Sequence, residues 1–177
     1  MAETFKLPCS SYEELIKLFQ AYANTKEGTA LSLDEITQAT GVPRTIVSKN
    51  NGFMVQVGLI TEGNKKAATE TGRALGRAYT SKITDEVERI WKEIIAEVDF
   101  LNRMLSAVRI RNGMDRSSFI NHIIYSSGLK DAKESRAGAG ALIEICVKYS
   151  VSFVFLSNTV AKYTLFEFLC IIGAIEP

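Results

Sequence analysis

Few of the residues that build enzyme active sites, metal centres or disulfide frameworks occur in this sequence. Its 177 residues include one histidine and three cysteines, and Cys9, Cys146 and Cys170 lie far apart. This odd number and wide spacing exclude a disulfide framework and a CxxC metal knuckle, and they favour a reducing compartment. His122 has neither a second histidine nor a neighbouring cysteine pair with which to bind zinc. We therefore expect no enzymatic activity, no metal and no cofactor.

Targeting and membrane-spanning segments are also lacking. The N-terminal residues contain no apolar core of a signal peptide. The longest strongly apolar stretch, Leu165 to Ile175, is interrupted by Glu167 and is far shorter than a membrane span. We expect a soluble, cytoplasmic protein that does not enter a membrane.

The positive charge is unevenly distributed along the chain. The formal net charge is only +1, which argues against a strongly basic nucleic-acid binder. Counted by segment, residues 1–40 carry −3, residues 41–82 carry +5 and residues 83–177 carry −1. The excess therefore lies in one stretch of about forty residues, which indicates a confined binding face for a polyanion.

Residues 11–50 have the pattern of three helices. An apolar face predicts a helix from Ser11 to Asn24, and the capping box Ser32-Leu33-Asp34-Glu35 predicts the start of a second. Gly41 ends that helix, and Pro43 suits the first turn of the next. Two short helices joined by a tight glycine turn describe a helix-turn-helix. Its second helix would expose side chains suited to phosphates and base edges, namely Arg44, Thr45, Ser48 and Lys49.

Residues 57–79 predict a basic hairpin followed by a further helix. Gly63-Asn64 is a hairpin-type turn between two short strands, with Lys65 and Lys66 at its tip. The helix after it places Arg73 and Arg77 on one face, because they are four residues apart.

The order of these elements, with "GLI" at 58–60 and "TETGRAL" at 69–75, resembles winged helix-turn-helix DNA-binding domains. It is most similar to the MarR-like and archaeal regulator types, over residues 11–82. The resemblance implies a major-groove role for the second helix and phosphate or minor-groove contacts for the wing and the following helix. Asn51 replaces the usual leucine, and Asn50-Asn51-Gly52 predicts an end or a kink in the recognition helix. The implied DNA contacts are Arg44, Thr45, Ser48, Lys49, Asn50, Lys65, Lys66, Arg73 and Arg77.

From Ile83 to Arg109 the chain contains neither proline nor glycine, which predicts one helix of about 26 residues. Such a helix is too long to be covered by the small winged domain. It must be buried by the C-terminal segment, by a second protomer or by both. Its length favours a dimer seam, made by two neighbouring lines of apolar residues that each repeat every seven positions and together form one apolar row: Val87, Trp91, Ile94, Val98, Leu101 and Leu105.

The remaining sequence predicts two more helices, at 115–127 and 132–149. The small residues Ala137 to Ala141 lack the lysine and further glycine of a phosphate loop, so we interpret them as allowing close helix packing. Residues 151–156 fit either a strand or a buried helix. Thr164 to Ile175 is apolar nearly all round, which indicates burial or an interface.

We therefore predict a mostly α protein with a winged helix-turn-helix at 1–82, including a small β-hairpin wing, and a helical body at 83–177 that contains one long helix. It would bind double-stranded DNA as a homodimeric transcriptional regulator. The alternative is a winged-helix adaptor without enzymatic activity, whose apolar C-terminal segment binds a protein partner in a larger complex.

Overall fold

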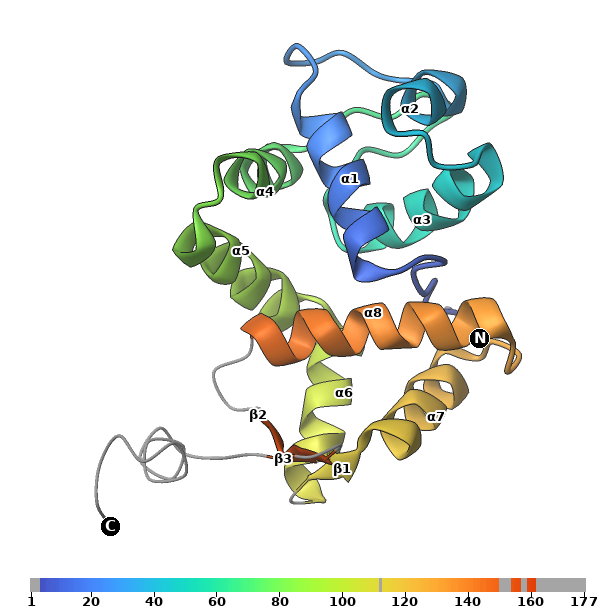
Figure 1. Ribbon diagram of the computed structural model, residues 1–177, viewed down its shortest axis with the longest axis vertical. Helices are drawn as coiled ribbons and strands as arrows, with labels where there is room; N and C mark the ends of the chain where they lie inside the picture. The colour runs from blue at the N-terminus through green and yellow to red at the C-terminus, as the bar shows by residue number, and fades with distance from the viewer. Residues whose placement is uncertain (1–3, 112, 150–153, 157–158, 162–177) are drawn as a thin grey trace.

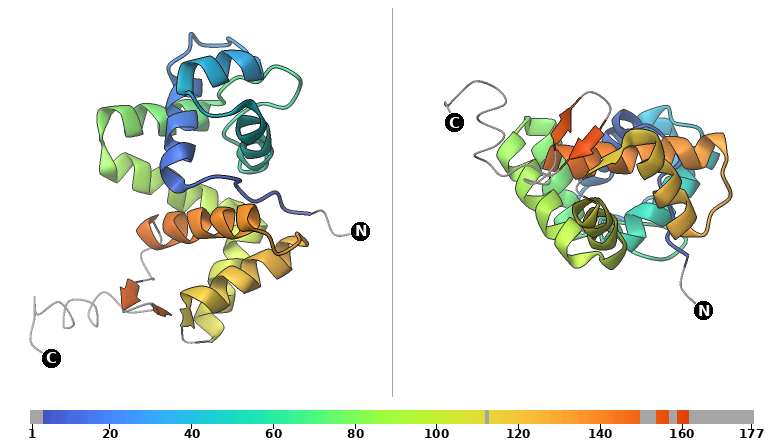
Figure 2. Two further views of the ribbon diagram at one scale, coloured as in Figure 1. Left: turned by 45° about the vertical axis from the view of Figure 1, so that its right-hand side comes forward. Right: turned by 90° about the horizontal axis from the view of Figure 1, so that it is seen from below.

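The computed structural model describes residues 4–111, 113–149, 154–156 and 159–161, and these are mostly helical, as predicted (Figure 1). Helix α1 stands between α4 on one side and α2 with α3 on the other, and α8 runs across beneath them. Helices α6 and α7 lie on the far side of α8 (Figure 2). In these ranges the helices are α1 (Tyr12–Ala23), α2 (Leu33–Thr40), α3 (Arg44–Gln56), α4 (Glu70–Ser81), α5 (Thr84–Glu97), α6 (Asp99–Ile110), α7 (Arg116–Ser127) and α8 (Lys133–Tyr149).

The helix ends in the N-terminal half follow the capping signals in the sequence. The Ser11 hydroxyl accepts a hydrogen bond from the backbone N–H of Glu14 at the start of α1. Ser32 and Glu35 form both hydrogen bonds of the capping box at the start of α2. Gly41 ends α2 with φ +71°, a left-handed conformation that glycine adopts without strain. The turn between α2 and α3 is therefore built as predicted.

Helix α3 continues through Asn50-Asn51-Gly52 to Gln56, so the predicted end is wrong. Asn50 is fully buried; its side-chain oxygen accepts from the backbone N–H of Cys9 at 2.8 Å, and its amide donates to the Ser10 hydroxyl at 2.9 Å. The Asn51 side chain accepts from the Tyr22 hydroxyl at 3.0 Å. These tertiary hydrogen bonds outweigh the poor helix propensity of asparagine and glycine, which amounts to about 1 kcal/mol per residue at most.

The segment after α3 lacks the two strands expected of a wing. Its pairing consists of two isolated bridges, between Ile60 and Ala68 and between Leu31 and Lys66. The Thr61 N–H also donates to the Ala67 carbonyl at 2.9 Å, which closes the loop between them. Few apolar side chains flank the polar tip of this loop. The segment therefore buries too little apolar surface to stabilise longer paired strands.

The predicted long helix is also wrong, because the chain breaks at Val98 into α5 and α6. Val98 has an extended backbone, with φ −83° and ψ 104°. Asp99 follows as the first residue of α6, where a carboxylate is favoured by the helix dipole and where aspartate is better placed than in a helix interior. The break redirects the chain so that both halves bury their apolar faces within one molecule.

One hydrophobic core cluster extends through both halves of the chain. A buried polar contact accompanies it: the Tyr12 hydroxyl lies 2.9 Å from that of Tyr79 and 2.6 Å from that of Tyr149. The indole N–H of Trp91 donates to the Tyr79 hydroxyl at 2.8 Å. Four helices, α1, α4, α5 and α8, are joined by these hydrogen bonds.

The C-terminal half contains the two further helices that were predicted, now α7 and α8. Asp115 caps α7 and Gly128 ends it with φ +72°. Gly138 of α8 permits a close approach, but to the N-terminal segment rather than to another helix, because a Cβ there would lie 1.8 Å from the carbonyl oxygen of Pro8. Residues 154–156 adopt the strand alternative; β1 (Met114–Asp115), β2 (Val154–Leu156) and β3 (Thr159–Ala161) form an antiparallel sheet in the order β1-β3-β2. The predicted apolar segment 164–175 lies outside the described residues.

Candidate nucleic-acid interface

The first two turns of α3 present a polar face to solvent. Arg44, Thr45, Ser48 and Lys49 are exposed there, while Val47 on the opposite side is fully buried in the core. This arrangement follows from the apolar spacing of the helix, whose core side is fixed by burial and whose outer side is left polar. Four of the five side chains expected on the recognition helix therefore share one accessible surface.

Asn50 is the exception, and its assignment to the major groove is wrong. Its side chain is fully buried and holds the N-terminal segment through Cys9 and Ser10. The burial of Asn50 could not be predicted from its neighbours in the sequence, because the adjacent Lys49 is exposed. The partners lie about forty residues earlier in the chain.

Both cations on this face are paired with carboxylates. The Arg44 guanidinium lies 2.7 Å from Asp34 at the start of α2, and both side chains remain more than half exposed. The Lys49 ammonium contacts the Glu134 carboxylate at the start of α8, also in an exposed setting. Exposed ion pairs of this kind contribute little to stability and exchange readily with other partners. Both cations thus remain available to an incoming anion.

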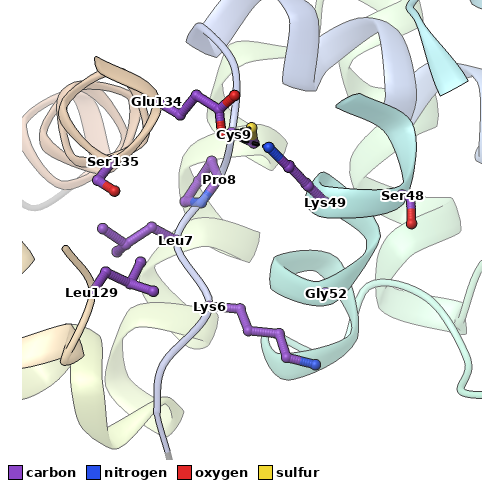
Figure 3. A pocket seen from close by; sticks show the side chains of 10 residues that line it. All are labelled: Lys6, Leu7, Pro8, Cys9, Ser48, Lys49, Gly52, Leu129, Glu134 and Ser135. Atoms are coloured by element: carbon purple, nitrogen blue, oxygen red, sulfur yellow. Dashed lines mark hydrogen bonds and ion pairs between the residues drawn. The ribbon is translucent and has the colours of Figure 1, made fainter. Parts of the chain in front are cut away.

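The Lys49–Glu134 contact spans a hollow of about 420 Å³ between α3 and the body (Figure 3). The hydrogen bond from Lys49 lowers the pKa of Glu134, and the same bond raises the pKa of Lys49. Burial, followed by the nearby Glu134 charge, raises the pKa of the Cys9 thiol. A thiol with a raised pKa is a poor nucleophile. The hollow is lined by Lys6, Leu7, Pro8, Cys9, Ser48, Lys49, Gly52, Leu129, Glu134 and Ser135.

Of these ten residues only Ser48 and Lys49 were identified as site residues from the sequence, and the charged residues that were missed are Lys6 and Glu134. The stem of Lys6 lies against Gly52 of α3, where a Cβ would come within 2.7 Å of the Lys6 side chain. Glu134 lies 85 residues after its partner Lys49. Neither position carries a local signal, since both depend on how the N-terminal segment and α8 fold back onto α3.

The two lysines of the predicted wing differ in exposure. Lys65 is exposed at the loop tip. Lys66 is half-buried; its backbone pairs with Leu31, and its ammonium donates to the Thr61 carbonyl at 3.5 Å. Lys65 is therefore the more accessible cation of this loop.

The two arginines of α4 do not lie on the α3 surface. Helix α4 lies on the opposite side of α1 from α3 (Figure 1). Arg73 is buried, with 9% of its surface exposed, and its guanidinium donates to the carbonyl of Thr25 at 3.0 Å. It lies beside the α1–α2 connection and across α1 from α3, so it cannot contact the backbone of a duplex bound at α3, as was predicted. Arg77 is exposed.

The apolar row assigned to a dimer seam is used within the single chain. Trp91 and Leu101 are fully buried, and Val98 packs against the same core at the break between α5 and α6. The row is therefore not a free surface, and the expectation that a second protomer covers it is wrong. The buried members are Val87, Trp91, Ile94, Leu101 and Leu105.

The described residues include neither a metal-binding cluster nor a membrane-spanning helix. They contain no group of three or more histidine, cysteine or acidic side chains able to hold a metal ion. None of their helices is long and apolar enough to span a membrane.

Comparisons with known proteins find no matching family model, no matching curated protein and no matching solved structure. The interpretation of the α3 surface therefore depends on its own geometry and charge.

Proposed function

We propose that the protein binds double-stranded DNA through the exposed face of α3. The observation that carries the proposal is the set of exposed polar and cationic side chains on the first two turns of a helix, directly after a capped helix and a left-handed glycine turn. The N-terminal residues of a recognition helix contact base edges in helix-turn-helix complexes. The side chains assigned to the groove are Arg44, Thr45, Ser48 and Lys49.

Phosphate contacts from outside α3 would fix the orientation of the protein on the duplex. Lys65 is exposed on the loop that takes the place of a wing, and Lys66 lies beside it. These lysines would reach the backbone or the minor groove, as in a winged helix-turn-helix. Four of the seven cations of residues 41–82, namely Arg44, Lys49, Lys65 and Lys66, lie on α3 or this loop and support this role, because phosphate contacts dominate DNA affinity.

A transcriptional regulator acting on paired half-sites would bind as a homodimer. One protomer has few cations on its α3 face and loop. Two protomers bound to one DNA site would raise the affinity, although each makes the same contacts as a single protomer. The dimer would use a surface other than the buried row that includes Trp91 and Leu101. Sedimentation of the free and DNA-bound protein measures the number of copies directly.

Fluorescence anisotropy with duplex DNA across a salt series tests the proposal. We expect saturable binding that weakens steeply as salt rises, since bound phosphates release counterions. The double variant Lys65→Glu with Lys66→Glu should weaken binding strongly. Wild-type protein that shows no binding at low salt would refute the DNA-binding proposal, and unchanged affinity in the double variant would refute the role of the loop.

A protein-binding adaptor is the second candidate function. Large apolar side chains are exposed on the body, with Tyr125 at 86% and Ile110 at 82% of their full surface. Exposed aromatic residues are enriched where proteins bind one another. This function is favoured if DNA binding is absent and Tyr125→Ser abolishes co-purification with a defined partner.

A further inference from the structure

A hollow of about 660 Å³ lies between the α1–α2 connection and the first two turns of α4. Arg73 and Arg77 line it together, because residues four apart in a helix share a face. Two carboxylates, Glu27 and Glu70, line it as well. The remaining lining residues are Gly28, Ala68 and Ala74.

Arg73 is a buried cation with few of its hydrogen-bonding groups used. Its surface is nine-tenths buried, and among the described residues its partner is the Thr25 carbonyl, to which one guanidinium nitrogen donates. None of the ion pairs within that part of the chain includes it. A guanidinium has five N–H donors, and a buried charge without a counter-ion is unfavourable. Among the described residues no Arg73 nitrogen is both buried and without a hydrogen bond, so its unused N–H groups reach solvent at the hollow, where an anion would bind them.

Arg77 adds a second guanidinium to the same space. It is exposed and makes no ion pair with any residue that the structure describes. Planar guanidinium groups bind phosphate oxygens through two parallel hydrogen bonds, which gives geometric selectivity as well as strength. The pair thus matches a phosphate group better than a single lysine would.

The two carboxylates restrict which phosphate compound fits. Glu27 and Glu70 are exposed and are not engaged in ion pairs within the described ranges. They repel a bare polyanion, but their oxygens accept hydrogen bonds from hydroxyl groups. A ligand with a phosphate at one end and hydroxyl groups at the other satisfies both kinds of residue.

We infer that this hollow binds a small sugar phosphate, with the phosphate on Arg73 and Arg77 and the sugar hydroxyls on Glu27 and Glu70. The inference is independent of the proposed DNA binding, because α4 lies across α1 from the α3 surface (Figure 1).

Isothermal titration calorimetry of the full chain tests this site, with ribose 5-phosphate as the probe. We expect saturable binding, weakened about ten-fold or more in Arg77→Gln because one bidentate contact is lost. Inorganic phosphate should bind more weakly than ribose 5-phosphate, and ribose should give no heat. Arg103→Gln is the matched control, since it removes an exposed arginine of α6 that pairs with Asp99.

Arg77 is exposed, so its replacement should leave the fold intact, and an unchanged circular dichroism melt checks this. The double variant Lys65→Glu with Lys66→Glu, which is designed to weaken DNA binding, should bind ribose 5-phosphate as wild type does, which separates the two proposals. The absence of saturable binding at millimolar ribose 5-phosphate, or equal affinity of Arg77→Gln and wild type, overturns the site. Equal affinity for inorganic phosphate and ribose 5-phosphate overturns the role of the two glutamates.

Discussion

The hydroxyl of Tyr12 lies 2.6 Å from that of Tyr149, so the first helix of the chain is hydrogen-bonded to α8 across 137 positions. The Tyr79 hydroxyl is hydrogen-bonded to that of Tyr12 and accepts a second hydrogen bond from the indole N–H of Trp91. Stacking of Trp91 on Tyr149, with ring centroids 6.4 Å apart, surrounds these hydrogen bonds with aromatic carbon. Buried polar groups satisfied in this way favour one arrangement of the packed helices.

Tyr12→Phe should therefore destabilise the protein by about 1–3 kcal/mol, since it leaves the buried Tyr149 hydroxyl without its partner. Urea unfolding followed by circular dichroism measures the difference. Tyr125→Phe is the matched control, because the Tyr125 side chain is 86% exposed and its loss of a hydroxyl should change little. Equal stability of the two variants would contradict a structural role for the tyrosine cluster.

The contact between α1 and α4 depends on Gly76. A Cβ at this position would lie 2.3 Å from the Cβ of Ala23 and 2.4 Å from the carbonyl oxygen of Phe19. Gly76→Ala should force the two helices apart and cost about 1–3 kcal/mol, although alanine is the better helix former. Thermal melts of Gly76→Ala and wild type measure this loss.

Gly140→Ala provides the control for that substitution. Gly140 is also inside a helix, but the nearest atom to its Cβ would be the flexible guanidinium of Arg116, at 3.3 Å. We expect neutral or slightly raised stability there, through helix propensity. A destabilised Gly140→Ala with an unaffected Gly76→Ala would contradict the packing described for both helices.

The elements with local signals were predicted best from the sequence. The capping box at Ser32 and the glycine turn at Gly41 both depend on residues within one or two turns. Such contacts are encoded by neighbouring residues, so a single sequence reveals them.

The errors arose where distant residues decide the outcome. Asn50 and Asn51 remain helical because Ser10 and Tyr22 bond to them. The apolar row around Trp91 repeats every seven residues whether or not the helix breaks, so periodicity did not reveal the turn at Val98. Aspartate at position 99 was the available local signal for a new helix start.

The predictions of surface exposure also succeeded where local residues decide the outcome and failed where distant residues decide it. Exposure of Arg44, Thr45, Ser48 and Lys49 followed from the core periodicity of α3. The burial of Arg73 did not follow from helical periodicity, because the segment that packs against it is the loop around Thr25. Helical spacing identifies which residues share a face, but it does not identify what packs against that face.

His122 should make stability depend on pH near neutrality. Burial, together with the charge of Arg111, lowers its pKa below the ordinary 6.5. The unfolded chain therefore binds a proton more readily than the folded one, so stability is complete above pH 6.5 and declines as pH falls through the folded pKa. Because this is the one histidine in the sequence, its single imidazole NMR signal reports the folded pKa directly.

His122→Gln is the variant that isolates this effect. Chemical unfolding between pH 7.5 and 5.5 should give a flatter stability profile for the variant than for wild type, since the carboxylates titrate mostly below this window. A folded pKa at or above 6.5, or identical pH profiles of the two proteins, would show that His122 is not desolvated.

In the proposed complex, Glu134 would compete with DNA phosphates for the ammonium of Lys49. The two side chains are in contact in the free protein, and both are more than half exposed. A phosphate at the same position must replace the carboxylate, and the retained negative charge of Glu134 repels the backbone. Glu134→Gln should therefore raise DNA affinity about two- to five-fold at low salt, with a smaller gain as salt screens the repulsion. Anisotropy titrations at several salt concentrations measure both quantities.

Two further variants distinguish this competition from a general charge effect. Glu93→Gln removes an equal charge from the Arg89 pair on α5, away from α3, and should leave affinity nearly unchanged. Lys49→Gln should weaken binding and reduce the salt slope by about one. When Glu134→Gln is added to the Lys49→Gln variant, DNA affinity should rise less than it does when Glu134→Gln is added to wild type, because the ammonium for which Glu134 competes is absent. Equal gains from Glu93→Gln and Glu134→Gln, or full additivity with Lys49→Gln, would show that Glu134 does not compete for Lys49.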